Sequence, residues 1–185
     1  MGKMGSTAPK NESSTRIRGI YHDVLYDPEG RILEDRGWCS NTILDGCRLL
    51  LAGFMRNETA GGITGLAVGQ GDPAWDTAGT PAPNPATTTG LVSRYNPIIP
   101  FSALEVVYLD QNDQIVTGPS MRLQMTATLV PGYPAPTAPL SSYALREFGL
   151  LAVLNGSEMM INNIRHPVLH KEEASTLIRV IRLYF

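Results

Sequence analysis

The sequence predicts a mainly β protein: an antiparallel β-sandwich or open barrel with one packed helix and long proline-rich loops. About seven or eight short segments are rich in β-branched and aromatic residues, or alternate apolar with polar residues, as strands do. Only one segment has apolar residues at helical spacing, and strands and helices do not alternate as βαβ units require. The chain of 185 residues is long enough for one domain with a sizeable core.

The chain begins with a polar stretch, and a hairpin follows. Residues 1–15 are small and polar and show no hydrophobic period, so we expect a flexible N-terminal arm ahead of a single β-rich domain at 16–185. Segments rich in Ile, Val, Leu and Tyr flank the sequence DPEG at 27–30, which has the residues of a β-turn. The first structured element is therefore predicted to be a β-hairpin over 17–38.

A helix is predicted near residues 42–55. Its apolar side chains recur at positions that share one face of a helix, whereas Asp45 and Arg48 lie elsewhere. Thr42, followed three residues later by Asp45, resembles a capping box, which favours a helix that begins there. The predicted apolar face consists of Ile43, Leu44, Cys47, Leu50, Leu51 and Phe54.

Two segments are predicted to be long surface loops. Residues 63–68, ITGLAV, form a strand candidate. The span 71–90 after it is rich in Pro, Gly, Thr and Ala, so it is expected to contain neither a helix nor a central strand. Residues 131–140, PGYPAPTAPL, form a second proline-rich loop. Loops of this length in a compact domain are usually functional or bound to a partner.

The second half of the chain is predicted to be a succession of strands. LEVVYLDQNDQIV, 104–116, has a polar turn between two strands, and MRLQMTATLV, 121–130, alternates between one apolar and one polar face. Asn155-Gly156 is the strongest hairpin-turn signal in the chain. The last segment, 175–185, is apolar on both faces, which predicts a strand covered by its own domain on one side and by another subunit on the other.

The stretch GLAVGQGDPAW at 65–75 contains Gly69-x-Gly71-x-x-Ala74, the glycine spacing of dinucleotide-binding loops. Such a loop must open a helix whose N-terminus receives the pyrophosphate, and the proline-rich residues that follow argue against that helix. Asp72 also places a negative charge where the phosphate would lie. We therefore expect no nucleotide site, and we interpret both glycines as a sharp exit from a sheet into a long loop.

No catalytic, cofactor or metal site is predicted. His166 and His170 suggest a metal pair, but Pro167 argues against a helix there, and in a strand the two histidines would be roughly 13 Å apart at about 3.3 Å per residue. A local turn would bring them together, which leaves a metal-dependent enzyme as a third hypothesis. Cys39 lies just before the predicted helix with no histidine placed beside it, and the sequence has no Gly-x-Ser-x-Gly elbow.

The composition favours neither nucleic acid nor a membrane as a partner. The 15 basic and 17 acidic residues leave a formal net charge of −2, so no long-range field attracts an anionic partner. No apolar run approaches the roughly 20 residues that cross a bilayer, and the N-terminus lacks the apolar centre of a signal peptide. We expect a soluble protein made in the cytoplasm.

From about residue 38 onward, the order of several short blocks resembles small structural proteins of tailed-phage tails and of contractile injection systems, of the collar, baseplate and fibre-attachment kind. The order of the blocks carries the resemblance, because each block alone is short. The blocks are NTILDGCRLLLAGFM at 41–55, ITGLAVGQGDPAWDT at 63–77, GLVSRY at 90–95, and a β-rich second half that ends in the hairpin and last strand at 145–185.

The resemblance implies a non-enzymatic structural subunit, with no cofactor and no small-molecule substrate, that forms a homo-oligomeric ring or fibre-attachment base in a virion tail or injection particle. A trimer or hexamer that also binds other tail proteins is expected. Because aromatic residues are enriched in interfaces, the predicted contact residues are Trp75, Tyr133, Tyr184 and Phe185. The alternative is a receptor- or carbohydrate-binding tail module, in which Trp75 and Tyr133 would stack on sugar rings.

Overall fold

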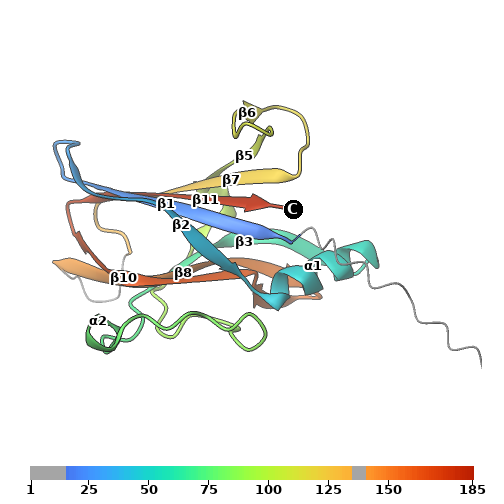
Figure 1. The fold of residues 1–185 in the computed structure, drawn as a ribbon, viewed down its shortest axis with the longest axis horizontal. Helices are drawn as coiled ribbons and strands as arrows, with labels where there is room; N and C mark the ends of the chain where they lie inside the picture. Colours follow the sequence, from blue (N-terminus) through green and yellow to red (C-terminus); the bar gives the residue numbers. More distant parts are fainter. Residues whose placement is uncertain (1–15, 135–140) are drawn as a thin grey trace, which may run out of the picture.

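The computed structural model describes residues 16–134 and 141–185, whose strands form one curled antiparallel sheet (Figure 1). The predicted arm at 1–15 and part of the second proline-rich loop, 135–140, lie outside the described residues. The strands are β1 (Arg18–Tyr26), β2 (Ile32–Ile43), β3 (Ala60–Gly69), β4 (Ile99–Pro100), β5 (Leu104–Leu109), β6 (Ile115–Val116), β7 (Arg122–Leu129), β8 (Ser142–Leu154), β9 (Ser157–Met160), β10 (Asn162–Glu172) and β11 (Thr176–Tyr184). The helices are α1 (Asp45–Met55), α2 (Trp75–Ala78) and a 3-10 turn, η1 (Phe101–Ala103).

The sheet curls into a half-barrel with two facing layers. Its strand order is β4-β3-β8-β10-β2-β1-β11-β7-β5-β6, with β9 paired to β8. One layer contains β1, β11, β7 and β5, and the other contains β3, β8 and β10 (Figure 1). Strand β2 joins the layers, because it pairs with β1 along most of its length and with β10 at its last residues. The predicted fold class, a mainly β open barrel with a packed helix, is confirmed.

The core lies between the two layers, where alternating residues of neighbouring strands meet in rows. Tyr21, Ile181 and Met125 are in register across β1, β11 and β7, and all three are buried. Four residues further along β1, Leu25 lies opposite Leu177 in a second buried apolar row. Since side chains alternate between the two faces of a strand, this one set of registers places the whole apolar row of each strand inside.

Helix α1 begins at Asp45 rather than near Thr42. Thr42 and Ile43 instead extend β2, where they pair with β10. Leu44, the residue before the helix, is extended, and no side chain caps the first turn. The predicted capping box is therefore wrong, because sheet pairing holds its first residue in an extended conformation.

The apolar face predicted for α1 is only partly buried. Cys47, Leu50 and Gly53 face the core at a spacing of three residues. A Cβ added to Gly53 would lie 2.6 Å from Leu154 Cδ1, so the helix packs closely at its glycine. This orientation turns Phe54, which was predicted to face the core, toward solvent.

A second helix was not expected in the proline-rich span, and there the prediction is wrong. Helix α2 is a single turn at Trp75–Ala78. Just before this helix, the side chain of Asp72 accepts a hydrogen bond from the backbone N–H of Ala74 at 2.9 Å. This contact stabilises the chain where the helix begins. Asp76, within the turn, binds the guanidinium of Arg146 in β8 through both carboxylate oxygens, at 2.8 and 2.6 Å. One local and one long-range contact therefore hold a helical turn in a span whose composition disfavours helix.

The hairpin turn and the last strand were predicted correctly. Asn155 and Gly156 both have positive φ, 52° and 78°, as the turn between β8 and β9 requires. Strand β11 lies between β1 and β7. Its inner side chains are buried, whereas Ile178 and Val180 on its outer face are half-buried. A neighbouring subunit against that outer face stays a prediction.

Candidate interaction surfaces

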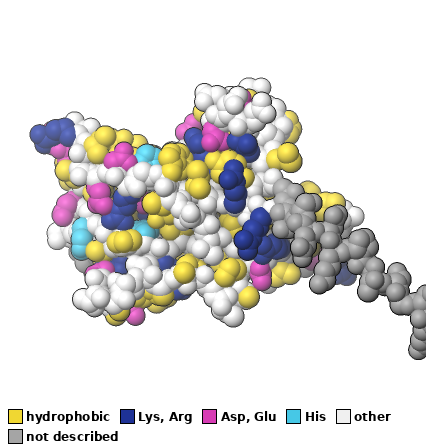
Figure 2. Space-filling model, viewed as in Figure 1, with side chains coloured by type: hydrophobic (Ala, Val, Ile, Leu, Met, Phe, Trp, Pro, Cys, Tyr) yellow, Lys and Arg dark blue, Asp and Glu magenta, His cyan; other side chains and the backbone are white. Residues whose placement is uncertain are grey.

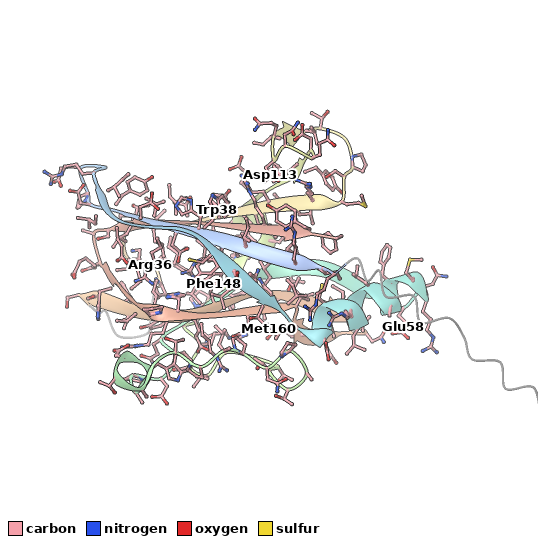
Figure 3. The ribbon with its side chains drawn as sticks, in the orientation of Figure 1. Arg36, Trp38, Glu58, Asp113, Phe148 and Met160 are labelled. Atoms are coloured by element: carbon pink, nitrogen blue, oxygen red, sulfur yellow. The ribbon has the colours of Figure 1, made fainter. Side chains whose placement is uncertain are left out.

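Two charged residues pair on the inner face of the sheet. Asp23 of β1 and Arg179 of β11 are directly opposite in register, and both are fully buried. The carboxylate oxygens of Asp23 accept hydrogen bonds from Nε and Nη2 of Arg179 at 2.7 and 2.6 Å. The guanidinium also stacks on Phe148, 3.5 Å from the ring centre, and Figure 3 shows Phe148 between the layers. Burial alone would raise the pKa of Asp23, but the adjacent Arg179 holds that pKa below its ordinary value.

Arg36 connects the two layers near the same place. The regular pairing of β10 with β8 is interrupted between residues 165 and 169 of β10. Arg36, which comes from β2, donates to the carbonyl oxygens of Pro167 and Val168 within that interruption, at 2.7 and 2.8 Å. Its side chain lies between the layers (Figure 3). The guanidinium thus satisfies backbone acceptors that lack a strand partner.

His166 lies between these arginines and is held in its neutral form. Its Nε2 is 3.2 Å from Nη2 of Arg179, and its Nδ1 is 2.8 Å from the carbonyl oxygen of Pro167. With its proton on Nδ1, the ring donates to the Pro167 carbonyl and Nε2 accepts from Arg179. Nη1 of Arg36, 3.1 Å from Nδ1, then donates to the Pro167 carbonyl and not to the ring. Burial, reinforced by the positive charge of Arg179, lowers the pKa of His166 to about 4.

Acid is expected to destabilise the fold through His166. Its pKa is about 4 in the folded protein against 6.5 ordinarily, so the unfolded chain binds the proton first and stability falls as the pH drops from about 6.5 to about 4. The full effect is on the order of 3 kcal/mol. Urea unfolding at pH 7 and pH 5 should show a smaller loss for His166→Gln than for the wild type. Equal losses in the two proteins would contradict this assignment.

At the end of β3 the chain turns sharply out of the sheet and begins the long loop, as we predicted from Gly69 and Gly71. A Cβ at Gly69 would lie 2.5 Å from the carbonyl oxygen of Ser93, so the returning loop approaches as closely as only glycine allows. Gly71 has a φ of +60°, in the left-handed region. The loop also returns beside its own start, where Arg94 forms an isolated bridge with Gly69. The interpretation of the glycines as the base of a loop is confirmed.

An apolar groove opens at one end of the half-barrel. It has a volume of about 330 Å³ and is bordered by α1, by the first half of β3 and by β5. Strand β3 pairs with β4 only at Gly65 and Leu66, and β5 pairs with β6 only at its last two residues. The sheet is therefore open between its two edges, and the groove is lined by α1, β3 and β5 at this opening. Its lining residues include Leu50, Ile63 and Val106.

Exposed apolar side chains surround this groove. We call them the mouth patch and define it as Leu51, Phe54, Met55, Phe101, Tyr108 and Met121, each more than a third exposed. Leu51, Phe101 and Tyr108 line the groove directly. Phe54 and Met55 follow Leu51 by three and four residues on α1, which places them on adjoining positions of the helix surface. Met121 lies beside the C-terminus, where its carbonyl oxygen accepts from the N–H of Phe185 at 2.9 Å.

Trp75 and Tyr133, two of the predicted contact residues, contact other parts of their own chain. Trp75 is half-buried, and the guanidinium of Arg165 lies 5.2 Å from its ring. The hydroxyl of Tyr133 donates to the carbonyl oxygen of Pro97 at 2.8 Å. Burial raises the pKa of Tyr133 to about 12. Both aromatic side chains therefore help to hold a long loop against the sheet.

Tyr184 and Phe185, the other two, lie at the end of β11. Tyr184 is on the outer face, between Arg18 and Arg122 of the adjacent strands. Phe185 lines the groove. The structure thus places one predicted contact residue in the groove. The mouth patch was missed, although the run of apolar residues on α1 beyond one helical face was a signal for it.

The two histidines considered for a metal site both lie in β10. His166 is buried and His170 is exposed. Within residues 16–134 and 141–185, no group of three or more His, Cys, Asp or Glu side chains is arranged to hold a metal ion. The metal-enzyme hypothesis therefore has no set of ligands in this part of the chain.

Comparisons with known proteins add no relative. No protein-family model, curated protein or solved structure matches this chain. No helix among the described residues is long and apolar enough to cross a membrane.

Proposed function

We propose that this protein is a non-enzymatic structural subunit of a phage-type tail or contractile injection particle, and that it assembles with copies of itself through the mouth patch. The observation that carries the proposal is the apolar groove, together with the exposed apolar side chains that surround it. Large exposed apolar patches on water-soluble domains mark interaction sites, because their burial on association is favourable.

The size of the patch suits association with a second copy of the chain. Phe54, Met55 and Met121 are 66%, 82% and 73% exposed. A large side chain presents on the order of 200 Å² when fully exposed, so the six residues of the patch leave roughly 700 Å², close to the roughly 800 Å² that one partner contributes to an interface of standard size. The patch therefore supplies most of the surface that one partner contributes to such an interface.

The resemblance to tail proteins involves the same part of the molecule. The block at 41–55 contains α1, and the block at 63–77 begins in β3. Both elements border the groove. Two of the blocks that carry the resemblance therefore contribute to the surface that we assign to assembly.

The double variant Leu51→Glu/Phe54→Glu is expected to dissociate the oligomer, because two carboxylates would have to be buried in an apolar interface. Size-exclusion chromatography with light scattering measures the mass of each protein over a range of concentrations. We expect assemblies of the wild type, and monomers of the variant at the same concentrations, with at least about a tenfold weaker association.

The matched control is Ile32→Glu/Leu33→Glu in the hairpin of β1 and β2, at the other end of the molecule (Figure 1). These two side chains are 59% and 55% exposed, so they match the exposure of the tested pair. The control should assemble as the wild type does. A wild-type protein that is monomeric at high concentration, or a control that dissociates equally, would contradict the proposal.

A further inference from the structure

A row of arginine and aromatic side chains crosses the outer face of the layer that contains β1, β11 and β7. Arg18, Tyr184 and Arg122 are direct neighbours in register on these three strands. The guanidinium carbons of Arg18 and Arg122 lie 4.6 and 5.3 Å from the centre of the Tyr184 ring. The aromatic ring thus holds two arginines side by side on the surface.

A second stack adjoins this row. Arg182, two residues before Tyr184 on the same face of β11, has its guanidinium 4.4 Å from the centre of the Trp38 ring. Trp38 comes from β2, is 45% exposed, and lies on the outer side of the layer (Figure 3). We call this surface the arginine face, defined by Arg18, Arg122, Arg182, Tyr184 and Trp38.

The arginine face carries more positive charge than its own carboxylates neutralise. Asp113, at the turn between β5 and β6, contacts both Arg122 and Arg182, at 2.8 and 3.0 Å. Arg18 has no ion pair among the described residues. Three arginines and one aspartate leave a local charge of +2 on a chain whose formal charge is −2. Figure 2 shows Lys and Arg side chains, in dark blue, on the surface near the place where β11 ends and β1 begins.

The geometry leaves hydrogen-bond donors free for an anion. A guanidinium has five N–H donors, and stacking on a ring uses its flat face and leaves the donors at its edge free. Within the described residues Arg18 donates no hydrogen bond, and Arg182 uses Nε on Gln124 and Nη1 on Asp113. The planar edge of a guanidinium matches a carboxylate, with which it forms paired hydrogen bonds.

We propose that the arginine face binds a carboxylate-rich segment of another protein. Nucleic acid is disfavoured, because the Tyr184 ring is only 8% exposed between two arginines and cannot stack on a base, which leaves Trp38 as a single exposed ring where such binders use several. The exposed indole of Trp38 gives the apolar part of a peptide a surface beside the charges. This site shares no residue with the mouth patch, although Met121 and Arg122 are neighbours in the chain, so the inference extends beyond the proposed self-assembly.

The probe for this site is a fluorescein-labelled oligoglutamate peptide, and its binding to the intact protein is measured by fluorescence anisotropy. We expect saturable binding at low salt that weakens as salt is added, since exposed charges are screened. The variant Arg18→Gln/Arg182→Gln should bind the peptide at least about tenfold more weakly.

The control is Arg31→Gln/Arg56→Gln, which removes the same charge from two side chains that are 75% and 82% exposed elsewhere. It should retain the wild-type affinity. An oligothymidylate of equal charge should bind more weakly than the peptide. The proposal is overturned if the peptide does not bind at low salt, if the control weakens binding equally, or if the oligothymidylate binds as tightly. Light scattering of the same variants should show unchanged self-assembly, which separates this site from the mouth patch.

Discussion

Replacing Asp23 by alanine is expected to lower the free energy of unfolding by about 3–5 kcal/mol, because it leaves a buried guanidinium without its counterion. Asp23 and Arg179 are both fully buried and share two short hydrogen bonds. Arg179 already has one buried nitrogen, Nη1, without a hydrogen-bond partner. After the substitution the stack on Phe148 would remain, but no carboxylate would balance the charge.

Urea unfolding of Asp23→Ala measures this cost. The control is Asp45→Ala, because Asp45 and its partner Arg48 are 50% and 51% exposed, and it should cost about 1 kcal/mol or less. The double variant Asp23→Leu/Arg179→Met should recover most of the loss, because apolar residues of similar volume often replace a buried pair without cost. A loss below about 1 kcal/mol for Asp23→Ala would show that water reaches the arginine. A double variant as unstable as the single one would contradict the proposed cause.

The strands were predictable because their apolar residues alternate, and a two-residue period leaves few other structures. The turn at Asn155-Gly156 was predictable from local conformation alone, since both residues tolerate positive φ. The first strand and the last, in contrast, lie at opposite ends of the described chain, and nothing local specifies that β1 pairs with β11. That register comes from tertiary packing.

The sequence contains a sign of the buried ion pair, because a charged residue interrupts the apolar row of each strand. The alternation of residues does not show which charged residues pair. Arg179 lies in the inward row of β11 between Leu177 and Ile181, and Asp23 lies in the inward row of β1 between Tyr21 and Leu25. A charged residue at an inward position destabilises the fold unless it has a partner. Two such residues of opposite charge therefore indicate a pair, although only the register shows that they face each other.

The loop after β3 shows why composition predicts local structure poorly. Its prolines and glycines do favour a loop, and most of it is one. Helix α2 forms nevertheless, because Arg146 binds Asp76 from a strand that is 70 residues away in sequence. The side-chain hydrogen bonds from Arg146 lower the pKa of Asp76, which keeps this contact charged. The residues next to Asp76 in the sequence give no indication of a contact with so distant a residue.

Replacing Lys171 by methionine is expected to raise the free energy of unfolding by about 2 kcal/mol, because a buried ammonium without a counterion destabilises the fold. Lys171 of β10 is fully buried, and no carboxylate lies within ion-pair distance of it among the described residues. Its nearest contacts are the carbonyl oxygen of Glu172, at 3.5 Å, and the Tyr143 ring, 5.7 Å from Nζ. Burial lowers the pKa of Lys171 to about 8.

The pH dependence separates this cause from a simple change in packing. The pKa of Lys171 is about 8 in the folded protein and 10.5 ordinarily, so the unfolded chain keeps its proton longer and wild-type stability should rise as the pH increases from about 8 to 9.5. Lys171→Met should lack that rise. Lys171→Arg, which keeps its charge throughout, should be less stable than the wild type at every pH in this interval. Thermal unfolding at pH 7.5, 8.5 and 9.5 tests all three proteins, and a methionine variant that is less stable than the wild type at pH 7.5 would refute the argument.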